Sequence, residues 1–249
     1  MAKPRDESED TEFKENQVIV AAKRALGLNK FYVAIAVAIG LGVLFVLNPA
    51  YANASSHSTS VGPATVTTTS LLAVPFSVLP MMTLTTPMVV LFVYDKNNGV
   101  LEYLLSLGIT QGEIYARYLK AALLVAVSYL LIFGTLNLVY SFARFGTSYL
   151  SRMLVILGIG GVIAVSTVAF IMAMMMIFSS LQKSRSGGNQ PLAVSLGLVG
   201  VLPGYIIPFV LPYDTAIAVE IAQGAIIAVL AITLIFMSPR LVRREKFLP

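Results

Sequence analysis

The chain has 249 residues, of which 57% are hydrophobic and only 12% are charged. A soluble domain carries about 25% charged residues, so this composition and the mean hydropathy of +0.83 exclude an ordinary water-soluble domain. Cysteine is absent, which excludes disulfides, thiol chemistry and cysteine-ligated metal. The net charge is +5, but no basic patch with interleaved aromatic residues accompanies it, so nucleic-acid binding is not expected.

The first 30 residues divide into two parts. Residues 1–12 contain five acidic and two basic residues and almost nothing apolar, which predicts a disordered acidic tail. Residues 13–30 are amphipathic on a helical wheel, with Val18, Ile19, Ala21, Ala22, Ala25 and Leu26 on one side and Asn16, Gln17, Lys23 and Arg24 on the other. This pattern predicts a connecting helix that lies in the membrane interface. The alternative is an extension of the first membrane helix.

Six apolar stretches follow, each of the length that crosses about 30 Å of hydrocarbon. They cover residues 31–47, 71–94, 119–142, 153–178, 192–211 and 219–238. The fifth contains Pro203 and Pro208, which predict a kink or a shorter span. We therefore expect an all-α integral membrane protein, with residues 31–249 forming a single six-helix transmembrane domain.

The distribution of Lys and Arg predicts the orientation, because these residues accumulate in cytoplasmic loops. With the N-terminus in the cytoplasm, six spans place 15 of the 17 basic residues on the cytoplasmic side, and only Arg144 and Arg152 outside. Both termini are then cytoplasmic, and the net charge is interpreted as contact with anionic lipid head groups. The outer loop 48–70 contains the sequon at Asn53 and the only histidine, His57, and we interpret it as an unmodified, solvated loop.

The segment between the second and third stretches, residues 94–125, holds the most informative pattern. Polar residues recur every fourth position at Asn98, Glu102 and Ser106, and the residues between them are mostly apolar. This predicts a short amphipathic helix at the cytoplasmic surface that ends at a joint near Gly108. Such a helix is either a coupling element that transmits movement from a cytosolic partner into two membrane helices, or an ordinary interfacial helix that closes the loop.

The third membrane helix has a recognisable start. Thr110 is followed three residues later by Glu113, which is the spacing of a capping box. We therefore expect this helix to begin near Gln111.

The same segment resembles the signature loop of ATP-binding-cassette (ABC) transporter permeases of the type-2 export family. The matching positions are Asp95, Gly99, Val100, Leu101, Glu102, Leu104, Leu105, Leu107, Ile109, Thr110, Glu113, Ile114 and Arg117. Gly108 stands where the family usually has Pro, and Arg117 where it usually has Lys; these replacements keep the turn and the charge. The N-terminal amphipathic helix and the six spans are also similar to the family's connecting helix and topology.

The resemblance implies a permease subunit of a prokaryotic plasma-membrane exporter. Such a subunit forms a homodimer or heterodimer with a second permease and binds one ATPase subunit per permease, so that two ATPase copies drive outward transport. The residues that the resemblance implies for coupling are Asp95, Gly99, Leu101, Glu102, Leu104, Leu105, Glu113 and Arg117. The chain has no GxxxxGK[ST] stretch, so we expect it to be no enzyme and to bind no cofactor itself, with ATP and Mg held by the partner ATPase.

Three further groups of residues are weaker candidates for a substrate path or a helix interface. Met172 and Met175 are suited to an adaptable apolar path, or simply to packing. Gly200 and Gly204 form a GxxxG pattern that permits close helix contact. Glu220 is an acid inside a predicted span, which makes it a functional candidate; alternatively it is hydrated near the outer surface or pairs with Arg144 or Arg152.

Other functions fit the residues less well. An ATP-independent transporter driven by ions would need charged residues in the bilayer interior, and the sequence offers no proton relay there. This scarcity of charge favours an apolar or amphiphilic substrate. An intramembrane hydrolase is not expected, because no two acids share a span and the single histidine lies in the outer loop. A non-transporting membrane anchor of a larger complex remains the main alternative.

Overall fold

The computed structural model describes residues 7–28, 30–42, 44–45, 86–178 and 213–241, and the regular elements in these ranges are all helices. The labelled helices are α1 (Glu7–Leu28), α2 (Lys30–Gly42), α5 (Val100–Ser106), α6 (Gln111–Phe145), α7 (Thr147–Phe178) and α9 (Tyr213–Leu241). Residues 86–97 form a further helical segment that leads into α5. The all-α fold is thus confirmed for the described part of the chain.

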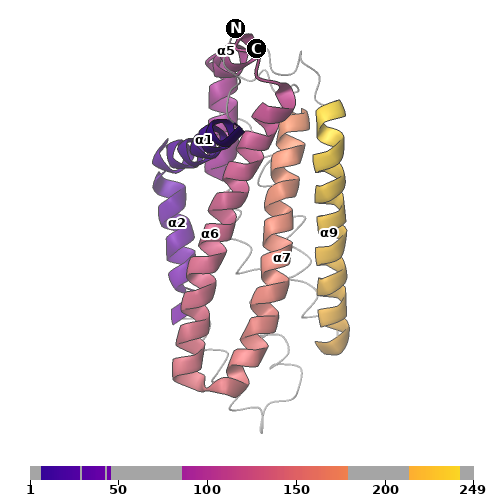
Figure 1. Ribbon diagram of the computed structural model, residues 1–249. Coiled ribbons are helices and arrows are strands. Elements are labelled where there is room, and N and C mark those ends of the chain that lie inside the picture. Colours follow the sequence, from indigo (N-terminus) through magenta and orange to yellow (C-terminus); the bar gives the residue numbers. More distant parts are fainter. Residues whose placement is uncertain (1–6, 29, 43, 46–85, 179–212, 242–249) are drawn as a thin grey trace.

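Helices α6, α7 and α9 stand side by side and form the body of the protein (Figure 1). Each contains a stretch long and apolar enough to cross a membrane: Gln111–Arg144, Leu157–Met174 and Ala218–Met237. These stretches coincide with the third, fourth and sixth predicted spans. Large apolar side chains on their outer faces are exposed, among them Leu131, Ile226 and Phe236. Such a surface requires lipid, so this is a membrane protein.

The other predicted spans are described only in part. Helix α2 has 13 residues, about 20 Å at 1.5 Å per residue, which is too short to cross the membrane alone. Only together with Gln17–Leu28 is it long and apolar enough to cross a membrane, and the two helices are bent by 88° relative to each other. The second predicted span is described from residue 86 onward, while the fifth, with Gly200 and Gly204, and the loop 48–70 lie outside the described residues. Six spans and cytoplasmic termini therefore stay predictions.

Helix α1 begins earlier than the sequence pattern predicted. It starts at Glu7, so residues 7–12, which we expected to be disordered, belong to the helix. Acidic residues are favoured in the first turns of a helix, where they interact with the positive end of its dipole, and residues 7–12 contain four acids. The buried face further along α1 consists of Ala21, Ala22 and Ala25, whereas Ile19, expected on that face, is 44% exposed.

Small residues allow the helices to approach one another closely. A Cβ atom added to Gly40 of α2 would lie 2.6 Å from Phe133 Cε1 and would also collide with the Tyr129 hydroxyl, both on α6. The Tyr129 hydroxyl donates a hydrogen bond to the Ala36 carbonyl of α2 at 3.2 Å. A Cβ atom added to Gly224 of α9 would meet Ile163 of α7 at 3.1 Å. Glycine at these positions is thus what permits α2 and α9 to pack against the two central helices.

Candidate functional site

Helix α5 lies at one end of the bundle, the same end at which α6 begins and α9 finishes (Figure 1). Two glycines bracket it, and both have left-handed backbone angles: φ is +71° at Gly99 and +82° at Gly108. Only glycine adopts this conformation without a steric penalty. The glycine that matches the family's signature at position 99 is therefore required by the backbone, because the helical segment 86–97 ends there and α5 begins.

The C-terminal end of α5 is a Schellman motif. The Ile109 amide donates to the Leu104 carbonyl at 3.2 Å, and the Gly108 amide donates to the Leu105 carbonyl at 3.1 Å. This pair of bonds around a left-handed glycine is the usual way to terminate a helix. Leu104 and Ile109, the two residues joined by the longer of these bonds, both pack against the core cluster. Gly108 thus produces the joint expected there, by its left-handed backbone conformation.

Helix α5 buries one narrow side and leaves much apolar surface exposed. Leu101 is fully buried, and Leu104 and Leu105 are half-buried against the core. In contrast, Tyr103 is 63% and Leu107 59% exposed. The sequence pattern around Asn98, Glu102 and Ser106 indicates a wide apolar surface on this helix, but it does not show which part of that surface contacts the bundle. The structure places Leu101 at the contact and leaves Tyr103 and Leu107 facing outward.

A capping box fixes the start of α6 at Gln111, as the spacing of Thr110 and Glu113 predicted. The Glu113 amide donates to the Thr110 hydroxyl at 3.3 Å, and the Thr110 amide donates to the Glu113 carboxylate at 2.9 Å. Two amides at the helix start are therefore satisfied by side chains. Because α5 ends at Ser106 and α6 begins at Gln111, the connection is only four residues long.

A partly buried ion pair joins α1 to the segment that carries α5. Arg24 Nη2 of α1 lies 2.9 Å from Asp95 Oδ1, and Arg24 Nη1 donates to Oδ2 at 3.4 Å. The Tyr118 hydroxyl of α6 donates to Asp95 Oδ2 at 2.5 Å. The Asp95 side chain is 2% exposed and that of Arg24 is 46% exposed. We name Arg24, Asp95 and Tyr118 the three-residue junction.

The junction links three elements that are far apart in the sequence. The Tyr118 ring also packs edge-on against Phe92 of the helical segment 86–97, with 5.3 Å between ring centroids. Partial burial lowers the pKa of the neighbouring Lys96 ammonium group. Because a buried carboxylate is stable only with its partners in place, α1, the segment before α5 and α6 are held in one fixed arrangement.

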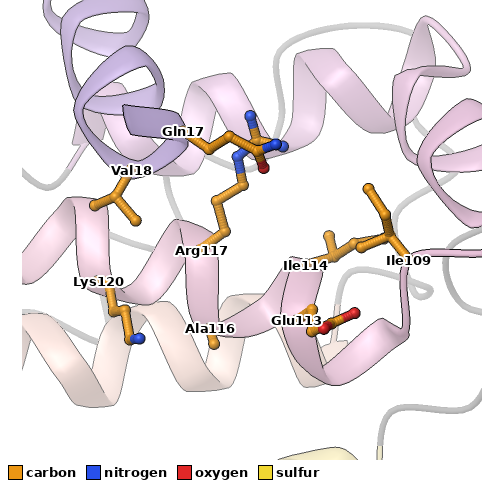
Figure 2. Close-up of a pocket in the computed structure, with 8 residues that line it drawn as sticks. All are labelled: Gln17, Val18, Ile109, Glu113, Ile114, Ala116, Arg117 and Lys120. Atoms are coloured by element: carbon orange, nitrogen blue, oxygen red, sulfur yellow. The ribbon is translucent and has the colours of Figure 1, made fainter. Parts of the chain in front are cut away.

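A pocket of about 280 Å³ opens between α1 and the first turns of α6. Its polar lining consists of Gln17, Glu113, Arg117 and Lys120, and its apolar lining of Val18, Ile109, Ile114 and Ala116. Figure 2 shows the Arg117 side chain extending from α6 toward Gln17 of α1, with Lys120 on the other side of Arg117 from Glu113. Four of the matched signature residues therefore line this pocket: Ile109, Glu113, Ile114 and Arg117.

The weaker candidates lie elsewhere. Met172 is fully buried in the core cluster, while the side chain of Met175 and the residues Gly200 and Gly204 are outside the described part. Glu220 is 0% exposed, and neither carboxylate oxygen has a hydrogen-bond partner among the described residues. The sequence suggests hydration near the outer surface, or pairing with Arg144 or Arg152, for this carboxylate; the Arg152 side chain lies outside the described residues. The structure buries Glu220 and leaves Arg144 exposed, because Glu220 lies one turn before Gly224, on the side of α9 that packs on α7.

Sequence reasoning missed two members of the junction. Arg24 had been assigned to the polar side of α1, and Tyr118 to no role. One signal was present: Asp95 directly follows a long apolar stretch, and an acid buried there needs a cationic partner. No pattern in one sequence indicates which of the 17 basic residues that partner is.

No family model matches the chain, and neither a curated protein nor a solved structure shows significant similarity to it. Among the residues that the structure describes, no three His, Asp or Glu side chains gather where a metal ion would bind. The functional interpretation therefore rests on the motif and on the geometry at the α5 end of the bundle.

Proposed function

We propose that the chain is the permease subunit of an ABC exporter of the type-2 export family, working with a second permease and two copies of a separate cytosolic ATPase. The α5 end of the bundle faces the cytoplasm of a prokaryotic cell, and α1 lies in the membrane interface as the connecting helix. ATP and Mg bind to the ATPase. The substrate is apolar or amphiphilic and moves outward.

One observation carries the proposal. The central part of the segment that resembles the family's signature forms a distinct seven-residue helix between two left-handed glycines. This helix contacts the bundle mainly through Leu101, while Tyr103 and the adjacent Leu107 are exposed. Exposed apolar side chains on a short, tightly terminated helix are suited to a protein partner. A partner that pulled on α5 would displace Asp95 and the start of α6 together, because only a few residues separate them from α5.

The junction supports the same interpretation from a second direction. Since Arg24 and Tyr118 share one buried carboxylate, movement at α5 would reach α1 as well as α6. A helix that merely closed a loop would need no such link to a segment 71 residues away. We therefore favour a coupling element over a simple interfacial closure, and a transporter over a static membrane anchor.

The direct test is to reverse the charge at Glu102, which is half-buried on α5. The proposal predicts a Walker-motif ATPase encoded beside the chain. The two should be co-expressed, and the purified complex assayed for ATP hydrolysis. We expect Glu102→Arg to reduce co-purified ATPase by about tenfold or more, because a misplaced charge at an interface costs several kcal/mol. Thr147→Arg, at the opposite end of the bundle (Figure 1), is the matched control.

If the Glu102→Arg variant co-purifies with the same amount of ATPase and hydrolyses ATP at the same rate, α5 does not bind the ATPase. A complex that forms but never hydrolyses ATP, in the unmodified chain, would instead support the anchor function.

A further inference from the structure

The pocket between α1 and α6 combines an apolar wall with two cationic side chains. Val18 of α1 and Ile114 of α6 contribute to the apolar wall, and Arg117 and Lys120 stand one turn apart on α6. Neither cation forms an ion pair among the described residues. Two positive charges without an ion-pair partner among the described residues, beside a half-open pocket of about 280 Å³, favour an anionic occupant.

The one acidic residue in the lining does not cancel this charge. Glu113 is held at the start of α6, where its carboxylate accepts from the Thr110 amide at 2.9 Å and from the Thr110 hydroxyl at 3.0 Å. In Figure 2 it lies apart from both Arg117 and Lys120. The Gln17 amide, opposite Arg117, adds a further hydrogen-bond donor.

We propose that this pocket binds the phosphate head group of an anionic glycerophospholipid from the leaflet in which α1 lies. Arg117 and Lys120 contact the phosphate, Gln17 donates to the head group, and Val18 and Ile114 contact the glycerol and the upper acyl chains. The bound lipid connects α1 with α6 beside the three-residue junction. In this proposal Arg117, which the resemblance implies for coupling, contacts the lipid, and no ATPase is needed for that contact.

The position of the pocket favours a lipid over a soluble anion. Helix α6 has 35 residues, about 52 Å at 1.5 Å per residue, and so exceeds the roughly 30 Å hydrocarbon core by several turns. The pocket residues on α6 belong to its first ten positions, where the helix enters the membrane. Basic pockets at this depth are suited to lipid head groups. A lipid also has acyl chains that contact the apolar wall, whereas free phosphate has no apolar part.

The test is to purify the full chain, reconstitute it in nanodiscs of phosphatidylcholine with a minor fraction of phosphatidylglycerol, and count retained lipids by native mass spectrometry. We expect the unmodified chain to retain phosphatidylglycerol in preference to phosphatidylcholine. The double variant Arg117→Gln with Lys120→Gln should reduce that retention by about tenfold or more, because it removes both charged contacts to the phosphate.

The matched control is Lys23→Gln with Lys30→Gln, which removes two exposed charges from α1 and α2 outside the pocket. It should change retention by less than about twofold, since surface charges attract lipid only diffusely. Equal losses in the two double variants would overturn the proposal, and so would full displacement of the lipid by inorganic phosphate. If the double variant fails to fold, Lys120→Gln alone should still retain less phosphatidylglycerol while its retention of phosphatidylcholine is unchanged. Unchanged retention of phosphatidylglycerol in that variant would overturn the proposal. No ATPase is present, so failure here would leave the proposed function untouched.

Discussion

Arg24→Ala should weaken the attachment of α1 to the bundle by about 2 kcal/mol. The substitution removes the cation that faces Asp95, whose side chain is 2% exposed. Among the described residues, that carboxylate then keeps only the hydrogen bond from the Tyr118 hydroxyl. Breaking a fully buried ion pair costs about 3–5 kcal/mol; the smaller value reflects the 46% exposure of the Arg24 side chain. Thermal unfolding of the purified chain and hydrogen exchange of the α1 amides measure the effect.

Two further variants distinguish the loss of the Arg24–Asp95 ion pair from the loss of any positive charge on α1. Lys23→Ala removes an exposed charge from the neighbouring position of α1 and should have almost no effect. Adding Asp95→Asn to Arg24→Ala should restore part of the lost stability, because the double variant no longer buries an unpaired charge. If Lys23→Ala and Arg24→Ala behave alike, the ion pair does not hold α1 in place.

Leu101→Ala should cost about 2–5 kcal/mol, the range for truncating a buried leucine to alanine. Leu101 is the fully buried residue of the contact between α5 and the bundle, to which the half-buried Leu104 and Leu105 also contribute. Its loss should release α5 before the rest of the protein, so the α5 amides should exchange much faster while those in the middle of α6 change little. Hydrogen exchange and thermal unfolding both report this.

Tyr103→Ala provides the control within the same helix. Its side chain is larger but 63% exposed, so we expect a change of about 0.5 kcal/mol or less. A loss of stability in Tyr103→Ala comparable to that in Leu101→Ala would contradict the orientation of α5 described above.

Features set by neighbouring residues could be predicted from the sequence. The capping box at Thr110 and Glu113 depends on a three-residue spacing, and the joint at Gly108 depends on one residue's backbone freedom. The apolar stretches in α6, α7 and α9 were recognised because the membrane requires a minimum run of apolar residues. Their helices extend beyond these stretches, since a helix does not have to end where the hydrocarbon does.

Features set by tertiary contacts could not be predicted. Arg24 and Asp95 are 71 positions apart, and no local pattern pairs them. A helical wheel showed that α5 is mostly apolar, but it could not distinguish the buried Leu101 from the exposed Tyr103. The burial of Glu220 depends likewise on how α9 packs on α7, and hydropathy alone places that residue near a surface.

Thiol labelling of two single-cysteine variants in intact cells tests the central claim most directly, because the natural chain contains no cysteine. Ser106→Cys places the thiol at the exposed end of α5, and Thr147→Cys at the exposed start of α7, at the opposite end of the bundle. With a membrane-impermeant maleimide, Thr147→Cys should be labelled in intact cells. Ser106→Cys should be labelled only after permeabilisation, and less so when the ATPase is co-expressed. Labelling of Ser106→Cys from outside intact cells would place α5 on the wrong side of the membrane for any cytosolic ATPase and would contradict the account.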